Sequence, residues 1–220
     1  MNVRDKSGHT VFSEGDVGAV HVMAHELLDS GRLDLGHERL GRWLIGRTGT
    51  GSDWAHIQFH MAVFELETGD WKSAYARFLE EIVPIAATSQ DALTDAPALA
   101  WRLLLKGRTQ EPLPWETLRR AALESLSRDP FVELHKLLAL AGARDTVGIA
   151  AWLDANRADV PSRSDRIVVR MADALEACAR NDDRRAAGLL KDVVPELPAI
   201  GGSAAQNGLF TELQARLEAA

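Results

Sequence analysis

Two pairs of histidines are the residues whose type and spacing best fit chemistry. His21 and His25 form one pair and His56 and His60 the other, each with a spacing of four residues. Random placement of seven histidines in this chain would give only about 0.2 such pairs. Residues four apart lie on one face of a helix, one turn from each other. If the two pairs lie on neighbouring helices, we expect the four imidazoles to converge.

The helical period also predicts the surroundings of these side chains. On the helix that carries His56 and His60, Gln58 and Glu65 define a polar face, and the two histidines point to the opposite side. His135 lies on the apolar side of a later helical run. These histidines are therefore expected to be at least half buried, where each ring nitrogen needs a partner.

Three interpretations of the histidines remain open. The first is a set of structural histidines bonded to carbonyls or to one another. The second is a site for zinc, nickel, copper or iron, because neutral imidazole is a common ligand of these ions. Its ligands would be the four paired histidines, with Asp29 or His135 in support. The third is a metal-free pocket in which imidazoles bind an anion or move protons.

Other features are weaker candidates. The segment from His25 to Asp29 begins like the zinc-protease motif H-E-x-x-H but ends in aspartate. Ser203 and Gln206 follow two glycines at a helix start, where free N–H groups can receive an anion, although a capping box explains the same side chains. Cys178 has no neighbouring activating residue and is expected to be a packed thiol.

Turn signals recur at nearly regular intervals and predict pairs of helices. Candidate turns lie at Gly31, Gly69, Gly107, Gly142 and Asn181–Asp182, which gives intervals of 38, 38, 35 and 39 residues. Helical runs are predicted before each turn, over Asp16–Ser30, Asp53–Thr68, Asp91–Lys106, Pro130–Ala141 and Asp165–Arg180. A second run follows each turn, over Leu33–Arg47, Trp71–Ala86, Trp115–Ser127, Thr146–Asn156 and Asp183–Val194.

The predicted fold class is all-α: an α-solenoid of about five tetratricopeptide-like helical hairpins plus a C-terminal helix over Ser203–Ala219. It forms a single domain over residues 14–220 after a polar N-terminal segment, residues 1–13. The second hairpin carries the clearest tetratricopeptide pattern, in Ala62, Gly69, Asp70, Trp71, Ala74, Phe78 and Pro84. A generic array of helical hairpins is the alternative. First helices line the concave surface of such arrays, so both histidine pairs are expected there.

Composition excludes several classes of function. The chain has 46% apolar and 26% charged residues, as in ordinary globular proteins. With 25 Lys and Arg against 32 Asp and Glu, its net charge of −7 argues against a nucleic-acid partner. A single cysteine excludes intramolecular disulfides. The polar start and the lack of a long apolar stretch argue against a signal peptide and a membrane span, which predicts a cytoplasmic protein.

Several of these motifs together resemble the tetratricopeptide repeat protein 38 family. The resemblance rests on Ala19–His25, His56–His60, His135 and Ile200–Gln206, and it extends from about Asp16 to the C-terminus. The chain corresponds to the C-terminal part of family members, as a short form. Residues matching the family's motif are His21, His25, His56, His60, His135, Gly202, Ser203 and Gln206. The sequence departs from the family at Ile57–Phe59 and at Val132–Glu133.

The function predicted from these observations is binding of a small ligand or metal ion in a histidine-lined concave pocket. The ligand-binding residues would be His21, His25, His56, His60, His135, Ser203 and Gln206, with the four paired histidines as metal ligands. An enzyme that uses the same histidines as metal ligands or as general acid and base is the first alternative. A protein-interaction scaffold is the second. Because segment 1–13 is a poor cap for the first repeat, homo-oligomer formation through that repeat is also predicted.

Overall fold

The computed structural model describes residues 3–4, 10–11, 14–108, 112–158 and 160–219. Within these ranges the regular secondary structure is helical except for β1 (Val3–Arg4) and β2 (Thr10–Val11), which pair antiparallel. These two short strands fall in the predicted N-terminal segment, and the rest of that segment lies outside the described residues. The predicted all-α class is confirmed.

The helices follow the predicted runs closely. In chain order they are α1 (Glu14–Asp29), α2 (Leu33–Leu44), α3 (Ser52–Glu67), α4 (Trp71–Arg77), the π-helical turn η1 (Phe78–Ile82), α5 (Val83–Ala86), the 3-10 turn η2 (Ala92–Thr94), α6 (Ala96–Leu105), α7 (Trp115–Glu124), α8 (Pro130–Gly142), α9 (Thr146–Asn156), α10 (Arg163–Ala179), α11 (Asp183–Val193), the 3-10 turn η3 (Val194–Ala199) and α12 (Ala204–Glu218). None of the described helices is long and apolar enough to span a bilayer.

One predicted turn is wrong by two residues. Gly142 is the last residue of α8, and a Cβ there would lie 2.3 Å from the Trp115 ring, so packing requires the glycine. Arg144, with φ of 56°, takes the left-handed conformation instead. In the turns that follow the first helix of each predicted pair, the residues with positive φ are Gly31, Gly69, Gly107, Arg144 and Asn181, at intervals of 38, 38, 37 and 37 residues. The turns are more regular than the sequence indicated.

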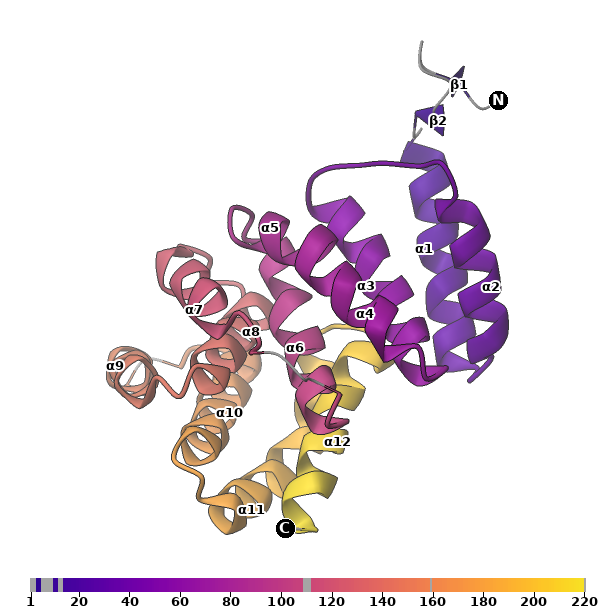
Figure 1. The fold of residues 1–220 in the computed structure, drawn as a ribbon. Helices are drawn as coiled ribbons and strands as arrows, with labels where there is room; N and C mark the ends of the chain where they lie inside the picture. Colours follow the sequence, from indigo (N-terminus) through magenta and orange to yellow (C-terminus); the bar gives the residue numbers. More distant parts are fainter. Residues whose placement is uncertain (1–2, 5–9, 12–13, 109–111, 159, 220) are drawn as a thin grey trace.

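Neighbouring helices pack in pairs, and the pairs contact each other in chain order (Figure 1). The predicted pairs of α1 with α2, α3 with α4, and α10 with α11 are present, whereas α7 packs mainly on α8 rather than on α6, its partner in the predicted third hairpin. The first helices also form a continuous series of contacts, from α1 to α3, α6, α8 and α10. The final helix, α12, turns back, packs on α11 and α6, and contacts α1. This arrangement brings α1, α3 and the start of α6 together.

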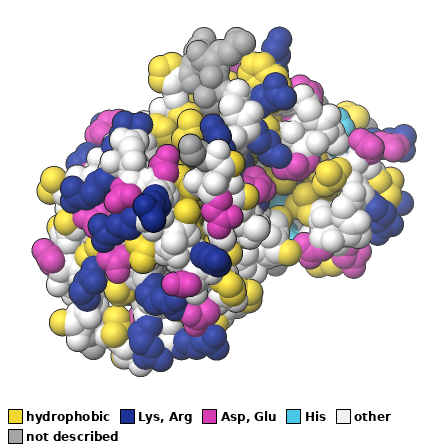
Figure 2. All heavy atoms as spheres, turned by 90° about the horizontal axis from the view of Figure 1, so that it is seen from below, with side chains coloured by type: hydrophobic (Ala, Val, Ile, Leu, Met, Phe, Trp, Pro, Cys, Tyr) yellow, Lys and Arg dark blue, Asp and Glu magenta, His cyan; other side chains and the backbone are white. Residues whose placement is uncertain are grey.

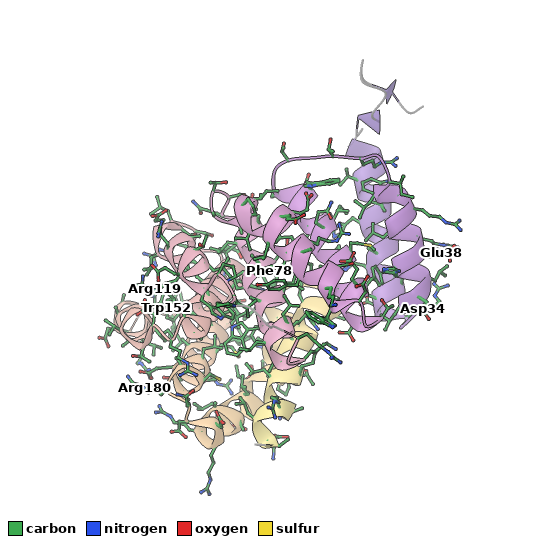
Figure 3. The ribbon with its side chains drawn as sticks, in the orientation of Figure 1. Asp34, Glu38, Phe78, Arg119, Trp152 and Arg180 are labelled. Atoms are coloured by element: carbon green, nitrogen blue, oxygen red, sulfur yellow. The ribbon has the colours of Figure 1, made fainter. Side chains whose placement is uncertain are left out.

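Helix α3 is shared by two hydrophobic clusters. Ile57, Met61 and Phe64 pack with apolar side chains of α1 and α2, whereas Phe59 and Ala62 belong to the large cluster that includes the later helices. Figure 3 shows Phe78, another residue of the large cluster, near the centre of the molecule. Because neighbours cover both sides of α3, its side chains have fixed orientations.

The polar face predicted on α3 does not face solvent. Gln58 and Glu65 are both buried, and both accept hydrogen bonds from the Arg77 guanidinium on α4. This polar face is buried, because the long Arg77 side chain satisfies these polar groups inside the protein. The pairing fixes the rotation of α3 and places His56 and His60 on the side that faces α1.

Replacing Gly36 in α2 by alanine is expected to destabilise the N-terminal helices. A Cβ at this position would lie 2.1 Å from the ring of Phe64, which is fully buried and cannot move aside. We expect Gly36→Ala to lower the free energy of unfolding by about 1–3 kcal/mol, measured by urea denaturation.

Gly41→Ala in the same helix is the matched control. Its nearest atom is the flexible Met61 Cε at 3.5 Å, an ordinary contact distance, so the substitution should be neutral or stabilising. Equal loss of stability in both variants would contradict the proposed close contact of α2 with Phe64.

Candidate metal centre

Four imidazoles converge where α1 packs against α3. His21 and His25 lie on α1, and His56 and His60 lie on α3. One ring nitrogen from each residue falls in a group whose members all lie within 4.8 Å of one another. The Nε2–Nε2 distances are 2.7 Å for His21–His25, 2.9 Å for His21–His56 and 3.1 Å for His56–His60. The predicted convergence of both pairs is confirmed.

The donor atoms are arranged as a cation would require. A neutral imidazole that donates through Nδ1 presents a lone pair on Nε2, so Nε2 atoms that face one another repel unless a proton or a cation lies between them. Nitrogen ligands of a tetrahedral zinc ion, at about 2.0–2.1 Å from the metal, lie about 3.3 Å apart. The three distances above are slightly shorter than this, and all the donor atoms lie within 4.8 Å of one another.

Asp95 holds one of the four rings in place. Its carboxylate lies at the start of α6 and accepts a hydrogen bond from His56 Nδ1, at 2.9 and 3.0 Å to its two oxygens. This bond leaves His56 Nε2 directed at the other histidines. Burial acts to lower the pKa of His56, but the hydrogen bond and negative charge of Asp95, with a contribution from Asp53, raise it overall. Carboxylate partners of this kind orient metal-binding histidines.

The other three rings favour the neutral form that binds metals. His60 is 0% exposed, and burial followed by the charges of its three histidine neighbours holds its pKa well below the ordinary value. Burial is also the first cause of the lowered pKa of His21 and His25, followed by the charge of His56. At neutral pH these groups carry free lone pairs. Figure 2 shows only small areas of histidine on its face of the molecule.

A pocket adjoins two of the four histidines. It has a volume of about 270 Å³ and lies between α1, the start of α3 and the segment around η2. His21 and His56 form part of its wall, together with Val17, Ser52, Asp53, Ile57, Asp91, Thr94 and Asp95. The donor group is therefore accessible from one side, whereas His60 is enclosed.

His135 does not join the four-histidine group. Its Nδ1 donates to the carbonyl of Phe131 at 2.7 Å, and its ring packs on the Phe131 ring with centroids 4.4 Å apart. Burial lowers the pKa of His135, and its Nε2 is buried without a partner among the described residues. Asp29, the other supporting residue suggested by the sequence, is exposed and outside the donor group. Neither residue supplies a ligand atom here.

Ser203 and Gln206 form a capping box at the start of α12. The Ser203 hydroxyl accepts from the Gln206 backbone N–H, and the Gln206 side chain accepts from the Ser203 backbone N–H. Gly202, just before them, packs so closely on Phe131 that a Cβ would lie 2.5 Å from its ring. The capping box is confirmed, and the binding of a ligand by these residues stays a prediction.

Cys178 has the packed environment that the sequence indicates. Burial, followed by the charge of Asp183, raises the pKa of its thiol to about 12, which keeps the thiol protonated. It lies on α10, away from the histidines on α1 and α3. Sulfur is therefore absent from the described donor group, which consists of imidazole nitrogen alone.

Asp95 is the residue of the centre that sequence analysis missed. It stands 39 residues after His56, which is close to the repeat interval, at the start of the third unit's first helix. In a repeat array, the start of one first helix lies beside the first helix of the preceding repeat. The spacing of about one repeat between His56 and Asp95 was therefore the signal that could have placed them together. Without the structure, Asp95 is indistinguishable from an ordinary helix-capping carboxylate.

No protein-family model matches the chain, and no solved structure matches it. A functional assignment therefore depends on the geometry of these side chains.

Acidification is expected to destabilise the metal-free protein. A histidine whose pKa is lowered by folding binds fewer protons than in the unfolded chain, so stability falls as the pH drops below the unfolded value of about 6.5. Among the described residues, folding lowers this pKa for His21, His25, His60 and His135 and raises it for His56. Thermal melting in a chelator should show a lower Tm at about pH 5.5 than at about pH 7.5.

His60→Gln tests the source of this dependence. The variant lacks the most strongly perturbed imidazole, so its Tm should change less between the two pH values. His37→Gln replaces a histidine of α2 outside the donor group and should retain the full dependence. A Tm that rises on acidification would contradict the burial of neutral imidazoles.

Proposed function

We propose that the protein binds one first-row transition-metal ion through His21, His25, His56 and His60. The observation that carries this proposal is the position of the four donor nitrogens, all within 4.8 Å of one another on two packed helices. The hydrogen bond from His56 to Asp95 supports it further. Hydrogen bonds between histidines account for the contacts of these rings, and what favours a metal over structural histidines is the carboxylate of Asp95 at His56 Nδ1.

The donor chemistry selects a class of ion. Imidazole nitrogen suits zinc, nickel, copper and iron, whereas magnesium and calcium prefer oxygen ligands. Four nitrogens close together on two rigid helices favour the tetrahedral coordination that zinc adopts readily. Zinc is therefore the first ion to test, and nickel, copper and iron are the others that the centre suits.

The wider setting forms part of the same proposal. The 37–38-residue interval between left-handed turns and the serial contacts of the first helices support a tetratricopeptide-like α-solenoid. Both histidine pairs lie on first helices, and they are among the residues on which the resemblance to the tetratricopeptide repeat protein 38 family rests. A small ligand bound beside the metal, a cytoplasmic location and self-association through the first repeat remain predictions within this proposal.

Metal-dependent catalysis is the second candidate function. It is favoured by the pocket of about 270 Å³, which brings solvent to the edge formed by His21 and His56. A substrate in this pocket would lie beside the ion, which would act as a Lewis acid. The scaffold alternative has less support, because α12 already covers part of α6 and contacts α1, where a peptide partner would bind.

Metal content is the direct test. Protein purified without a histidine tag and loaded with zinc should contain about one ion per chain by elemental analysis. His60→Ala removes a fully buried donor and should lower zinc affinity by at least about tenfold, since chelate sites lose much of their affinity with one ligand. Isothermal titration measures both values.

His37→Ala serves as the control for loss of a histidine as such. It should keep the stoichiometry and affinity of the parent, since His37 lies on α2 outside the donor group. Circular dichroism checks that each variant is folded. Equal zinc affinity in the parent and the His60→Ala variant would refute the proposed centre.

Asp95 should act as a positioning residue. Asp95→Asn removes the charge that holds His56 Nδ1 and orients its Nε2, so zinc affinity should fall about 10–100-fold with the stoichiometry unchanged. Asp34→Asn, on the outer side of α2 (Figure 3), is the control and should bind zinc as the parent does. An unchanged affinity in Asp95→Asn would show that the carboxylate does not support the centre.

A further inference from the structure

We infer that metal ions reach the four-histidine centre through the pocket between α1, α3 and η2, and that Asp53 and Asp91 draw hydrated cations into it. The inference rests on the proposed metal site and adds how that site is loaded and which class of ligand its open side admits.

The pocket offers an approach to the donors at His21 and His56, whereas His25 is partly exposed outside it. Of the four histidines, His21 and His56 line it, and the His56 side chain is 24% exposed. His60 is fully buried beneath them, so an ion cannot arrive from its side of α3. An ion that enters the pocket meets His56 and His21 first and then reaches the remaining two nitrogens.

Carboxylates surround this approach. Asp53 and Asp91 are exposed at the rim, and Asp95, with its side chain 2% exposed, lies at the base against His56. None of the described residues that line the pocket is lysine or arginine. No ion pair involves Asp53 or Asp91 within the described part of the chain, so both charges act on the pocket.

The carboxylate of Asp53 lies on the same face of α3 as His56 and His60. Asp53, His56 and His60 occupy positions i, i+3 and i+7, which lie on one face of a helix. Asp53 also lines the same pocket as His21 and His56, so its charge lies beside these two donors. A cation attracted to Asp53 is therefore one helical turn from its first nitrogen ligand.

This arrangement favours cations before any bond to nitrogen forms. A hydrated ion first forms an outer-sphere complex, whose population depends on the local potential, and then exchanges water for imidazole. Charged clefts raise association rates by about 10–1,000-fold, and salt screens the effect. The same carboxylates repel anions, so the open side of the centre suits a cation and disfavours phosphate or carboxylate ligands.

Stopped-flow binding of Co²⁺ tests the inference, because its visible absorption intensifies in a four-coordinate nitrogen site. In the double variant Asp53→Asn/Asp91→Asn at low ionic strength, we expect the association rate constant to fall about tenfold. The dissociation rate constant should change less than about twofold, because neither carboxylate is a ligand. At about 1 M salt, where the Debye length is about 3 Å, the two association rates should become equal.

Two further variants make the outcome decisive. Asp34→Asn removes a charge from the outer side of α2 and should associate at the parent rate. Asp29→Asn tests the C-terminal end of the same face of α1, because Asp29 follows His25 by four residues. Slower association in Asp29→Asn, with the parent rate in the double variant, would overturn the inference and place the approach beside His25. Failure of the parent protein to bind either Co²⁺ or Zn²⁺ would refute the metal site itself.

Discussion

Four nitrogen lone pairs held within a few ångströms of one another impose the central constraint on this structure. Such a group is stable only with protons or a cation between its members. Asp95 favours the state in which a proton or a cation lies among the nitrogens, since its negative charge at His56 Nδ1 stabilises positive charge within the group. The rest of the local structure serves to keep the donors close in spite of their repulsion.

Helix α3 provides most of that support. Its apolar side chains pack into both hydrophobic clusters, and its buried Gln58 and Glu65 are fixed by Arg77. With these contacts on its other sides, α3 cannot rotate to separate its histidines from those of α1. Burial of a helix on nearly every side usually accompanies a purely apolar sequence. Here the buried Gln58 and Glu65 are tolerated because Arg77 pairs with both, and the buried His60 belongs to the donor group.

The sequence predicted the site better than its surroundings. Helical spacing placed His21 with His25 and His56 with His60, and the repeat interval placed the two helices side by side. It did not reveal Asp95, because a carboxylate at a helix start has an ordinary local function and its contact with His56 depends on packing between repeats. It also misplaced the fourth turn, because Gly142 was taken for a turn residue although its small size is needed beside Trp115.

The donors belong to two different parts of the hydrophobic core. His21 and His25 lie on a helix held mainly by the smaller N-terminal cluster, whereas α3 is anchored in the larger one. Regions with few buried apolar contacts open more readily than the rest of a protein. A bound ion would bridge these two units and oppose their separation by RT ln(1 + [M]/Kd). The concentration of free metal ion would then set how often the first helical pair detaches, because the free energy of this local opening would rise with that concentration.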